Sequence, residues 1–148
     1  MTTVSPSWNY TLHLPHDPRA PGIARGALRL ILAAHEMPEL TPTAELLAAE
    51  LLTNSHRHTK GPYALRVRSA EPGRLRVAVR DTDPRVPPGF LDRDSPVHPL
   101  DLDAEDGRGL HLVQACADNW GASVLRELGA SKGGKLPWAE CGGGAAAW

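Results

Sequence analysis

The sequence is poor in cysteine and aromatic residues, and it has neither a dominant charge nor a long apolar run. Two cysteines, Cys116 and Cys141, are too few for a disulfide scaffold and lack CxxC spacing, so we expect buried, reduced thiols. The 16 basic and 17 acidic residues give a net charge of −1, which disfavours nucleic acid and anionic membranes as partners. No apolar run approaches the roughly 20 residues of a membrane span, and residues 1–10 lack a signal-peptide pattern, so we expect a cytoplasmic protein.

The residues that are present fit one globular domain. A chain of 148 residues, 41% hydrophobic and 22% charged, has the length and composition of a single packed domain. We expect a flexible N-terminus over residues 1–7, the folded domain over 8–141, and a disordered tail of small residues over 142–148. Residues 84–106 hold five prolines and little periodicity, which predicts a long loop.

Hydrophobic periodicity predicts eight regular elements in the order β-α-α-β-β-loop-α-β-β. Strands are expected at Trp8–Leu14, Tyr63–Ser69, Leu75–Asp81, Ala122–Leu128 and Leu136–Cys141, and helices at Ile23–His35, Thr41–His58 and Gly107–Asn119. The stripe of the first helix expected to face the core holds Ile23, Ala27, Leu30, Ile31 and Ala34. This order indicates an α+β fold, a two-layer α/β sandwich with a mostly antiparallel sheet and three helices on one face.

The second predicted helix carries a polar row. Glu50, Asn54 and His58 are spaced i, i+4, i+8, which places a carboxylate, an amide and an imidazole along one helical face. Such a row suits a polar cleft at the edge of a core. A solvated helix face is the commoner origin of this spacing.

Two further segments suit the recognition of a nucleotide. Asp81 ends a strand, and its carboxylate can accept hydrogen bonds from the exocyclic amine of a purine, although an aspartate here also suits a simple turn. The segment Gly107-Arg108-Gly109-Leu110 opens a helix, where backbone N–H groups and the helix dipole favour an anion such as phosphate. Glycines in this position also serve simply to change the direction of the chain.

Two other patterns are excluded as sites. Residues 129–135 nearly spell a phosphate-binding P-loop, but Leu136 replaces the Ser or Thr that would bind Mg²⁺, and Pro137 follows. His56 and His58 suggest a zinc site, but side chains two residues apart diverge on a helix and no cysteine pair accompanies them.

Taken together, these segments resemble the GHKL ATPase family, specifically the small anti-sigma-factor serine/threonine kinases. Residues 50–58 (ELLTNSHRH) resemble the N box of the family, residues 81–84 (DTDP) a variant first glycine box, residues 107–110 (GRGL) the second glycine box, and residues 134–140 (GKLPWAE) the closing strand. The resemblance covers residues 8–141.

The resemblance implies ATP and Mg²⁺ as cofactors and assigns roles to the matched residues. Asn54 would coordinate Mg²⁺, Glu50 would be the general base, and Asp81 would bind the adenine amino group. Gly107 and Gly109 would donate backbone N–H groups to the phosphates. The remaining cofactor-binding positions would be Arg108, which adds charge, Leu110 of the same box, and His58, near the phosphates or Mg²⁺-bound water. Residues 84–106 would be the ATP lid.

The family also implies protein partners. The phosphate acceptor would be a serine on an anti-anti-sigma antagonist, the chain would sequester a sigma factor, and it would form a homodimer. Two alternatives stay open: a nucleotide-binding switch module without kinase activity, and a plain α+β interaction domain.

The sequence departs from the family pattern in three places. The first glycine box lacks its glycines. Leu136 and Pro137 stand where a Thr-Val pair is usual, and Pro137 predicts an edge strand or an interrupted one. Residues 81–106 hold eight acids and two arginines, a charge of −6, which would repel ATP unless Mg²⁺ screens it. This acidic segment would otherwise face a basic partner surface or be a solvated loop.

Overall fold

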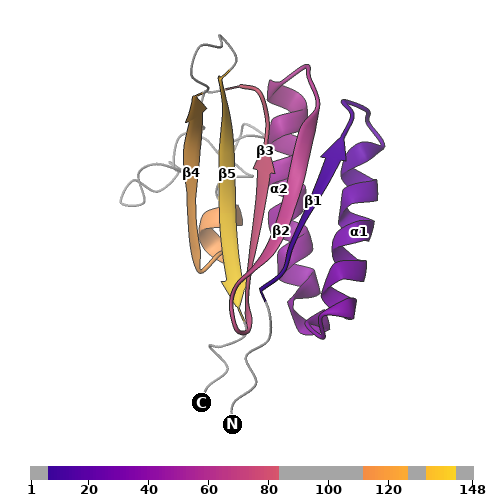
Figure 1. The fold of residues 1–148 in the computed structure, drawn as a ribbon, viewed down its shortest axis with the longest axis vertical. Helices are drawn as coiled ribbons and strands as arrows, with labels where there is room; N and C mark the ends of the chain where they lie inside the picture. Colours follow the sequence, from indigo (N-terminus) through magenta and orange to yellow (C-terminus); the bar gives the residue numbers. More distant parts are fainter. Residues whose placement is uncertain (1–6, 84–111, 127–132, 143–148) are drawn as a thin grey trace.

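The sheet consists of five strands in the order β1-β2-β3-β5-β4, and every neighbouring pair is antiparallel. This computed structural model describes residues 7–83, 112–126 and 133–142 (Figure 1). The strands are β1 (Asn9–Leu14), β2 (Tyr63–Glu71), β3 (Arg74–Arg80), β4 (Asn119–Arg126) and β5 (Gly133–Gly142). The predicted α+β class and antiparallel sheet are confirmed.

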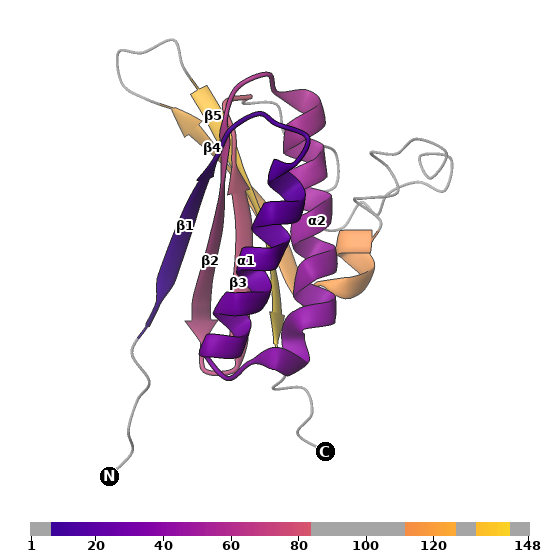
Figure 2. The ribbon, with the colours of Figure 1, turned by 90° about the vertical axis from the view of Figure 1, so that its right-hand side faces the viewer.

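The helices cover one face of this sheet, as predicted (Figure 2). They are α1 (Ala20–Ala34), α2 (Thr41–His58), a short 3₁₀ turn η1 (Pro38–Leu40) and a helical segment at 112–116. Helix α2 lies over β3 and β5, and α1 packs beside it. The core between the two layers consists of leucines, valines and alanines, with Leu28, Leu47, Leu65 and Val79 fully buried.

Helix α1 buries a different face from the predicted one. Ile23 and Leu30, both predicted to face the core, are 64% and 73% exposed. The buried positions are instead Ala20, Ala24, Leu28 and Leu32, which have the i, i+4 spacing of one helical face. Both faces of this helix are apolar, so periodicity does not select between them. Small alanines on the buried face allow α1 to approach the sheet and α2 closely.

Strand β5 is longer and more central than predicted. It begins at Gly133 rather than at Leu136, and it pairs with β3 on one side and β4 on the other, so it is not an edge strand. The alternative prediction of an interruption at Pro137 is confirmed on the β3 side. The regular β3–β5 ladder ends with Ala78 opposite Trp138, and an isolated bridge between Asp81 and Lys135 continues the same register beyond the proline.

Both cysteines are free thiols, but only one of them is fully buried as predicted. Burial raises the pKa of Cys141 to about 11, whereas Cys116 is partly buried. Among the residues that the structure describes, no helix is long and apolar enough to cross a bilayer.

Candidate functional site

Helix α2 carries the predicted polar row along one side. Glu50 and Asn54 are half-buried, whereas His58, near the C-terminal end of the helix, is exposed. Burial raises the pKa of the Glu50 carboxyl above its ordinary value, because removal from water disfavours the charged form. The adjoining side of the helix buries Leu47, Leu51 and other small or apolar residues in the core, so the row lies at the edge of the core. A partly desolvated carboxylate one turn before an amide oxygen can accept a proton beside a bound cation.

Asp81 lies directly after β3, and its carboxylate is fully buried beneath α2. The hydroxyl of Ser55, the residue after Asn54, donates a hydrogen bond of 2.6 Å to Asp81 Oδ2. The backbone N–H of Asp83 donates to Asp81 Oδ1 at 2.9 Å. These bonds hold the end of β3 against the same stretch of α2 that carries Asn54, so the structure brings these two predicted residues into one region.

Lys135 was not among the predicted site residues, yet it completes this cluster. Its ammonium nitrogen lies 3.0 Å from each carboxylate oxygen of Asp81 and 3.0 Å from the Asp83 carbonyl oxygen. The side chain is 1% exposed. Side chains alternate between the two faces of a strand, so Lys135 lies on the same face of β5 as Ala139 and Cys141, which are buried. This alternation is the signal in the sequence that could have indicated its burial.

The backbone on both sides of Asp81 and Lys135 fixes their alignment. The N–H of Asp81 donates to the Lys135 carbonyl at 3.1 Å, and the N–H of Lys135 donates back at 3.3 Å. Residues that exchange both bonds point their side chains to the same face of the sheet. A Cβ atom on Gly134 would overlap the Asp81 carbonyl oxygen, so the chains can approach this closely only with glycine there.

A threonine pair also connects α2 to the region after β3. The hydroxyls of Thr59 and Thr82 are 2.9 Å apart, and Thr59 Oγ1 accepts a hydrogen bond of 3.2 Å from the Gly61 N–H. Thr59 directly follows α2 and is 8% exposed. The end of this helix is therefore anchored to the segment that follows Asp81.

His56 of α2 contacts two residues outside this helix. His56 Nδ1 is 2.8 Å from the Tyr63 hydroxyl, and the His56 ring stacks on His16 with a centroid distance of 4.1 Å. These contacts give His56 a packing role at the junction of α2 and β2. Among residues 7–83, 112–126 and 133–142, no group of three or more His, Cys, Asp or Glu side chains could hold a metal ion by itself.

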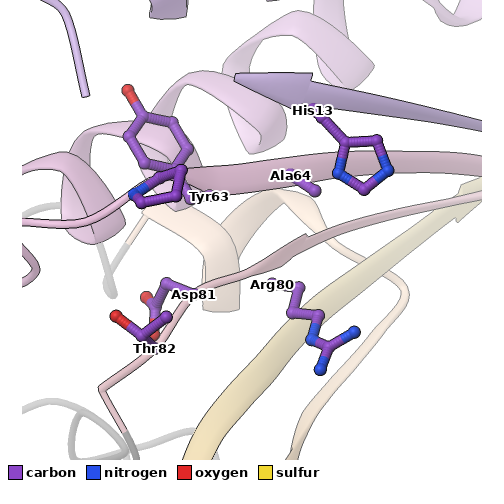
Figure 3. A pocket seen from close by; sticks show the side chains of 7 residues that line it. His13, Tyr63, Ala64, Arg80, Asp81 and Thr82 are labelled. Atoms are coloured by element: carbon purple, nitrogen blue, oxygen red, sulfur yellow. The ribbon is translucent and has the colours of Figure 1, made fainter. Parts of the chain in front are cut away.

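A shallow pocket lies at the adjacent ends of β1, β2 and β3 (Figure 3). His13, Ala64 and Arg80 stand opposite one another on these three strands, and all three alternate with core residues. Their side chains therefore lie on the sheet face away from α1 and α2. Tyr63, Asp81 and Thr82 line the pocket as well, and the Asp81 carboxylate bonds to Ser55 on α2, so the pocket reaches the strand ends beside the Asp81 cluster.

The second glycine box and the predicted lid lie outside the described residues. This applies to Gly107, Arg108, Gly109 and Leu110, and to residues 84–106. The described part of the site is therefore Glu50, Asn54 and His58 on α2, together with the cluster of Asp81, Ser55 and Lys135.

The fold is a two-layer α+β domain, with an antiparallel sheet covered on one face by helices. A row of a carboxylate and an amide lies beside a buried aspartate, and together these features define a domain of the ATPase type. The sequence matches the family of the histidine kinase-like ATPase domain over residues 14–131, so the chain belongs to this family. Membership in a family of ATPases implies ATP binding.

Comparison with solved structures supports the same fold. The chain is similar to a chain of the SiaB–SiaC complex from Pseudomonas aeruginosa, with a TM-score of 0.66 and 15% sequence identity. The similarity covers 89% of this chain and 88% of that chain. No curated protein matches the sequence.

Proposed function

We propose that this chain is an ATP-dependent regulatory kinase. It would transfer the γ-phosphate of ATP to a serine of an antagonist protein and also sequester a sigma factor. The observation that carries the proposal is the half-buried Glu50 one helical turn before Asn54, on the helix to which Asp81 is bonded. These are the positions at which the chain resembles the N box and first glycine box of its family.

The donor atoms on α2 fit a hydrated Mg²⁺. Mg²⁺ prefers oxygen ligands, keeps several waters and is held by one or two protein side chains together with substrate phosphates. The side-chain oxygen of Asn54 would supply such a ligand, with His58 near Mg²⁺-bound water. When bound, the ion would neutralise charge on the phosphates.

Glu50 would accept the proton of the attacking serine hydroxyl. Partial burial raises its pKa, which makes the carboxylate a stronger base than an exposed glutamate. Phosphoryl transfer needs positioning and charge neutralisation more than covalent help from the protein. One base, a metal ligand and the phosphate-binding N–H groups of Gly107 and Gly109 would therefore suffice.

The similarity to a chain of the SiaB–SiaC complex supports a protein partner, because that fold was solved in a complex of two proteins. An anti-anti-sigma antagonist and a sigma factor are the partners we propose. We also propose a homodimer and a cytoplasmic location.

The second candidate is a nucleotide-binding switch without kinase activity. The engagement of Asp81 by Lys135 supports it, because a carboxylate that is not available to the adenine amino group would hold ATP less firmly in position for phosphate transfer. The two candidates differ in phosphate transfer, whereas both require nucleotide binding.

Thermal unfolding with millimolar MgATP tests nucleotide binding. A ligand that binds only the native state raises Tm, so we expect an increase for the wild type and none for Asn54→Ala. Thr53→Ala, at the exposed position beside Asn54, is the matched control and should keep the increase. Equal increases for all three proteins would remove Asn54 from the site, and no increase for the wild type would reject nucleotide binding.

Phosphate transfer from labelled ATP to a candidate antagonist protein separates the two candidates. Glu50→Gln should retain the MgATP effect on Tm but transfer phosphate about 10²-fold or more slowly, because a general base contributes on that order. Equal rates for wild type and Glu50→Gln would reject Glu50 as the base. Binding without transfer by the wild type would support the switch module.

A further inference from the structure

The carboxylate that would bind the adenine amino group has no acceptor capacity left. An ionised carboxylate offers about four lone-pair sites on its two oxygens. Asp81 Oδ2 accepts a hydrogen bond of 2.6 Å from the Ser55 hydroxyl and lies 3.0 Å from Lys135 Nζ in an ion pair. Oδ1 accepts hydrogen bonds from the Asp83 N–H at 2.9 Å and from the same ammonium at 3.0 Å. The side chain is also fully buried, so no ligand reaches it without a rearrangement.

The ammonium of Lys135 is equally well satisfied. It has three N–H donors, and three acceptors lie 3.0 Å away: the two oxygens of Asp81 and the carbonyl of Asp83. Hydrogen bonds between ionised partners are roughly twice as strong as those between neutral ones. A neutral purine amine would therefore bind the Asp81 carboxylate more weakly than the ammonium does, and it cannot displace the ammonium. The paired backbone bonds and Gly134 hold the two residues in this alignment.

We propose that Lys135 occupies the place of the base amine, so that the nucleotide site of this chain does not discriminate adenine from other purines. This inference rests on the proposed nucleotide binding and concerns its specificity. Affinity would come from the phosphate and metal contacts, while Asp81 and Lys135 close the base-recognition position. Lys135 is thus a specificity-determining residue that suppresses the adenine preference.

The test compares MgATP, MgITP and magnesium tripolyphosphate by titration calorimetry. ITP carries an oxygen in place of the adenine amino group. We expect the wild type to bind ATP and ITP within about threefold of each other, because Asp81 is already occupied. A wild-type preference for ATP of about tenfold or more would overturn the inference while leaving the proposed function intact. This comparison needs no variant.

Replacing the lysine should create the preference. Lys135→Thr removes the ammonium and leaves space beside Asp81, so ATP should bind about tenfold or more tightly than ITP. The double variant Asp81→Ala with Lys135→Thr removes both the ammonium and the acceptor oxygens, so it should show no ATP preference. Lys60→Thr makes the same change at an exposed lysine and should behave as the wild type.

The outcomes separate the two claims. A folded Lys135→Thr protein, verified by circular dichroism, that still binds ATP and ITP equally would overturn the inference alone. An ATP preference in the double variant would also overturn it, because the carboxylate would not be its source. If neither the wild type nor Lys135→Thr binds any of the three triphosphates, both the inference and the proposed function fail.

Discussion

Burial of the Glu50 carboxylate has a consequence for stability that is separate from catalysis. Its pKa is raised in the folded protein, so folding disfavours the charged form. A group with this shift costs stability once the pH rises through its folded pKa, and it costs nothing when it is protonated in both states. The cost is therefore present at neutral pH and disappears below the ordinary glutamate value of 4.5.

We expect Glu50→Gln to stabilise the protein at neutral pH. The amide has a similar shape and no charge to desolvate, so Tm at pH 7 should rise by about 1–3 °C, and the difference should vanish near pH 4. Thermal unfolding across this pH range measures it. Glu45→Gln is the control, because Glu45 lies on the same helix with a salt bridge of 2.8 Å to Arg29, and its loss should not raise Tm. A lower Tm for Glu50→Gln at pH 7 would mean that the carboxylate has a stabilising partner.

Single residues also show what local sequence can and cannot predict. The row of Glu50, Asn54 and His58 follows from helical spacing alone, because its members are neighbours within one element. The surroundings of Asp81 do not, because its side-chain donors come from Ser55, 26 residues earlier, and Lys135, 54 residues later. Such a cluster depends on strand register, which short-range patterns do not specify.

Among the elements, α1 ends in a way that its sequence does not signal. The N–H of Met37 donates to the Leu32 carbonyl at 2.8 Å, and the N–H of Glu36 donates to Ala33 at 3.2 Å. This is a Schellman motif, which requires a left-handed residue and usually has glycine there. Glu36 occupies that position with φ of 59°. Pro38 indicates in the sequence that the helix ends nearby. The cap itself depends on Glu36, and glutamate rarely adopts a left-handed conformation.

Glu36→Gly should therefore stabilise the protein by about 0.5–1 kcal/mol. Glycine removes the steric cost of the left-handed conformation, and this gain exceeds the extra freedom that it gives the unfolded chain. Urea unfolding at equilibrium measures the change. Glu39→Gly, in the neighbouring 3₁₀ turn, is the control and should destabilise, because the turn has no positive φ there to relieve. Destabilisation by Glu36→Gly would indicate that the Glu36 side chain contributes more than the strain costs.

The sequence predicts the order of the elements more accurately than their buried faces and their ends. Strand and helix periods arise within one segment, so this order follows from local pattern. The buried face of α1 and the central position of β5 depend on which surfaces meet, and Ile23 and Pro137 each suggested a different environment locally. Tertiary packing therefore decided what the apolar pattern left open.

For the whole molecule, the net charge of −1 conceals an uneven distribution. Residues 81–106 contain eight of the 17 acids and two of the 16 basic residues. The rest of the chain then has 14 basic and nine acidic residues, a net charge of +5. One of the eight acids, Asp81, is paired with Lys135, whereas the acids beyond residue 83 lie outside the described part of the chain. A polyanionic ligand near this segment would experience repulsion that Mg²⁺ and salt reduce.

Neutralising four of these acids should strengthen MgATP binding. For the variant Asp101→Asn, Asp103→Asn, Glu105→Gln and Asp106→Asn, we expect about 3–10-fold tighter binding at roughly 0.1–0.15 M ionic strength. The gain should shrink toward zero near 1 M salt, where the screening length is about 3 Å. The control neutralises Glu36, Glu39 and Glu71, which line a depression at the Glu71 end of β2, roughly 25 Å along the strand from the end beside Asp81. That distance exceeds the screening length of about 8 Å at physiological salt, so the control should bind as the wild type does. An equal gain in both variants would indicate a net-charge effect, and a gain that persists at high salt would indicate that the four acids act through structure rather than charge.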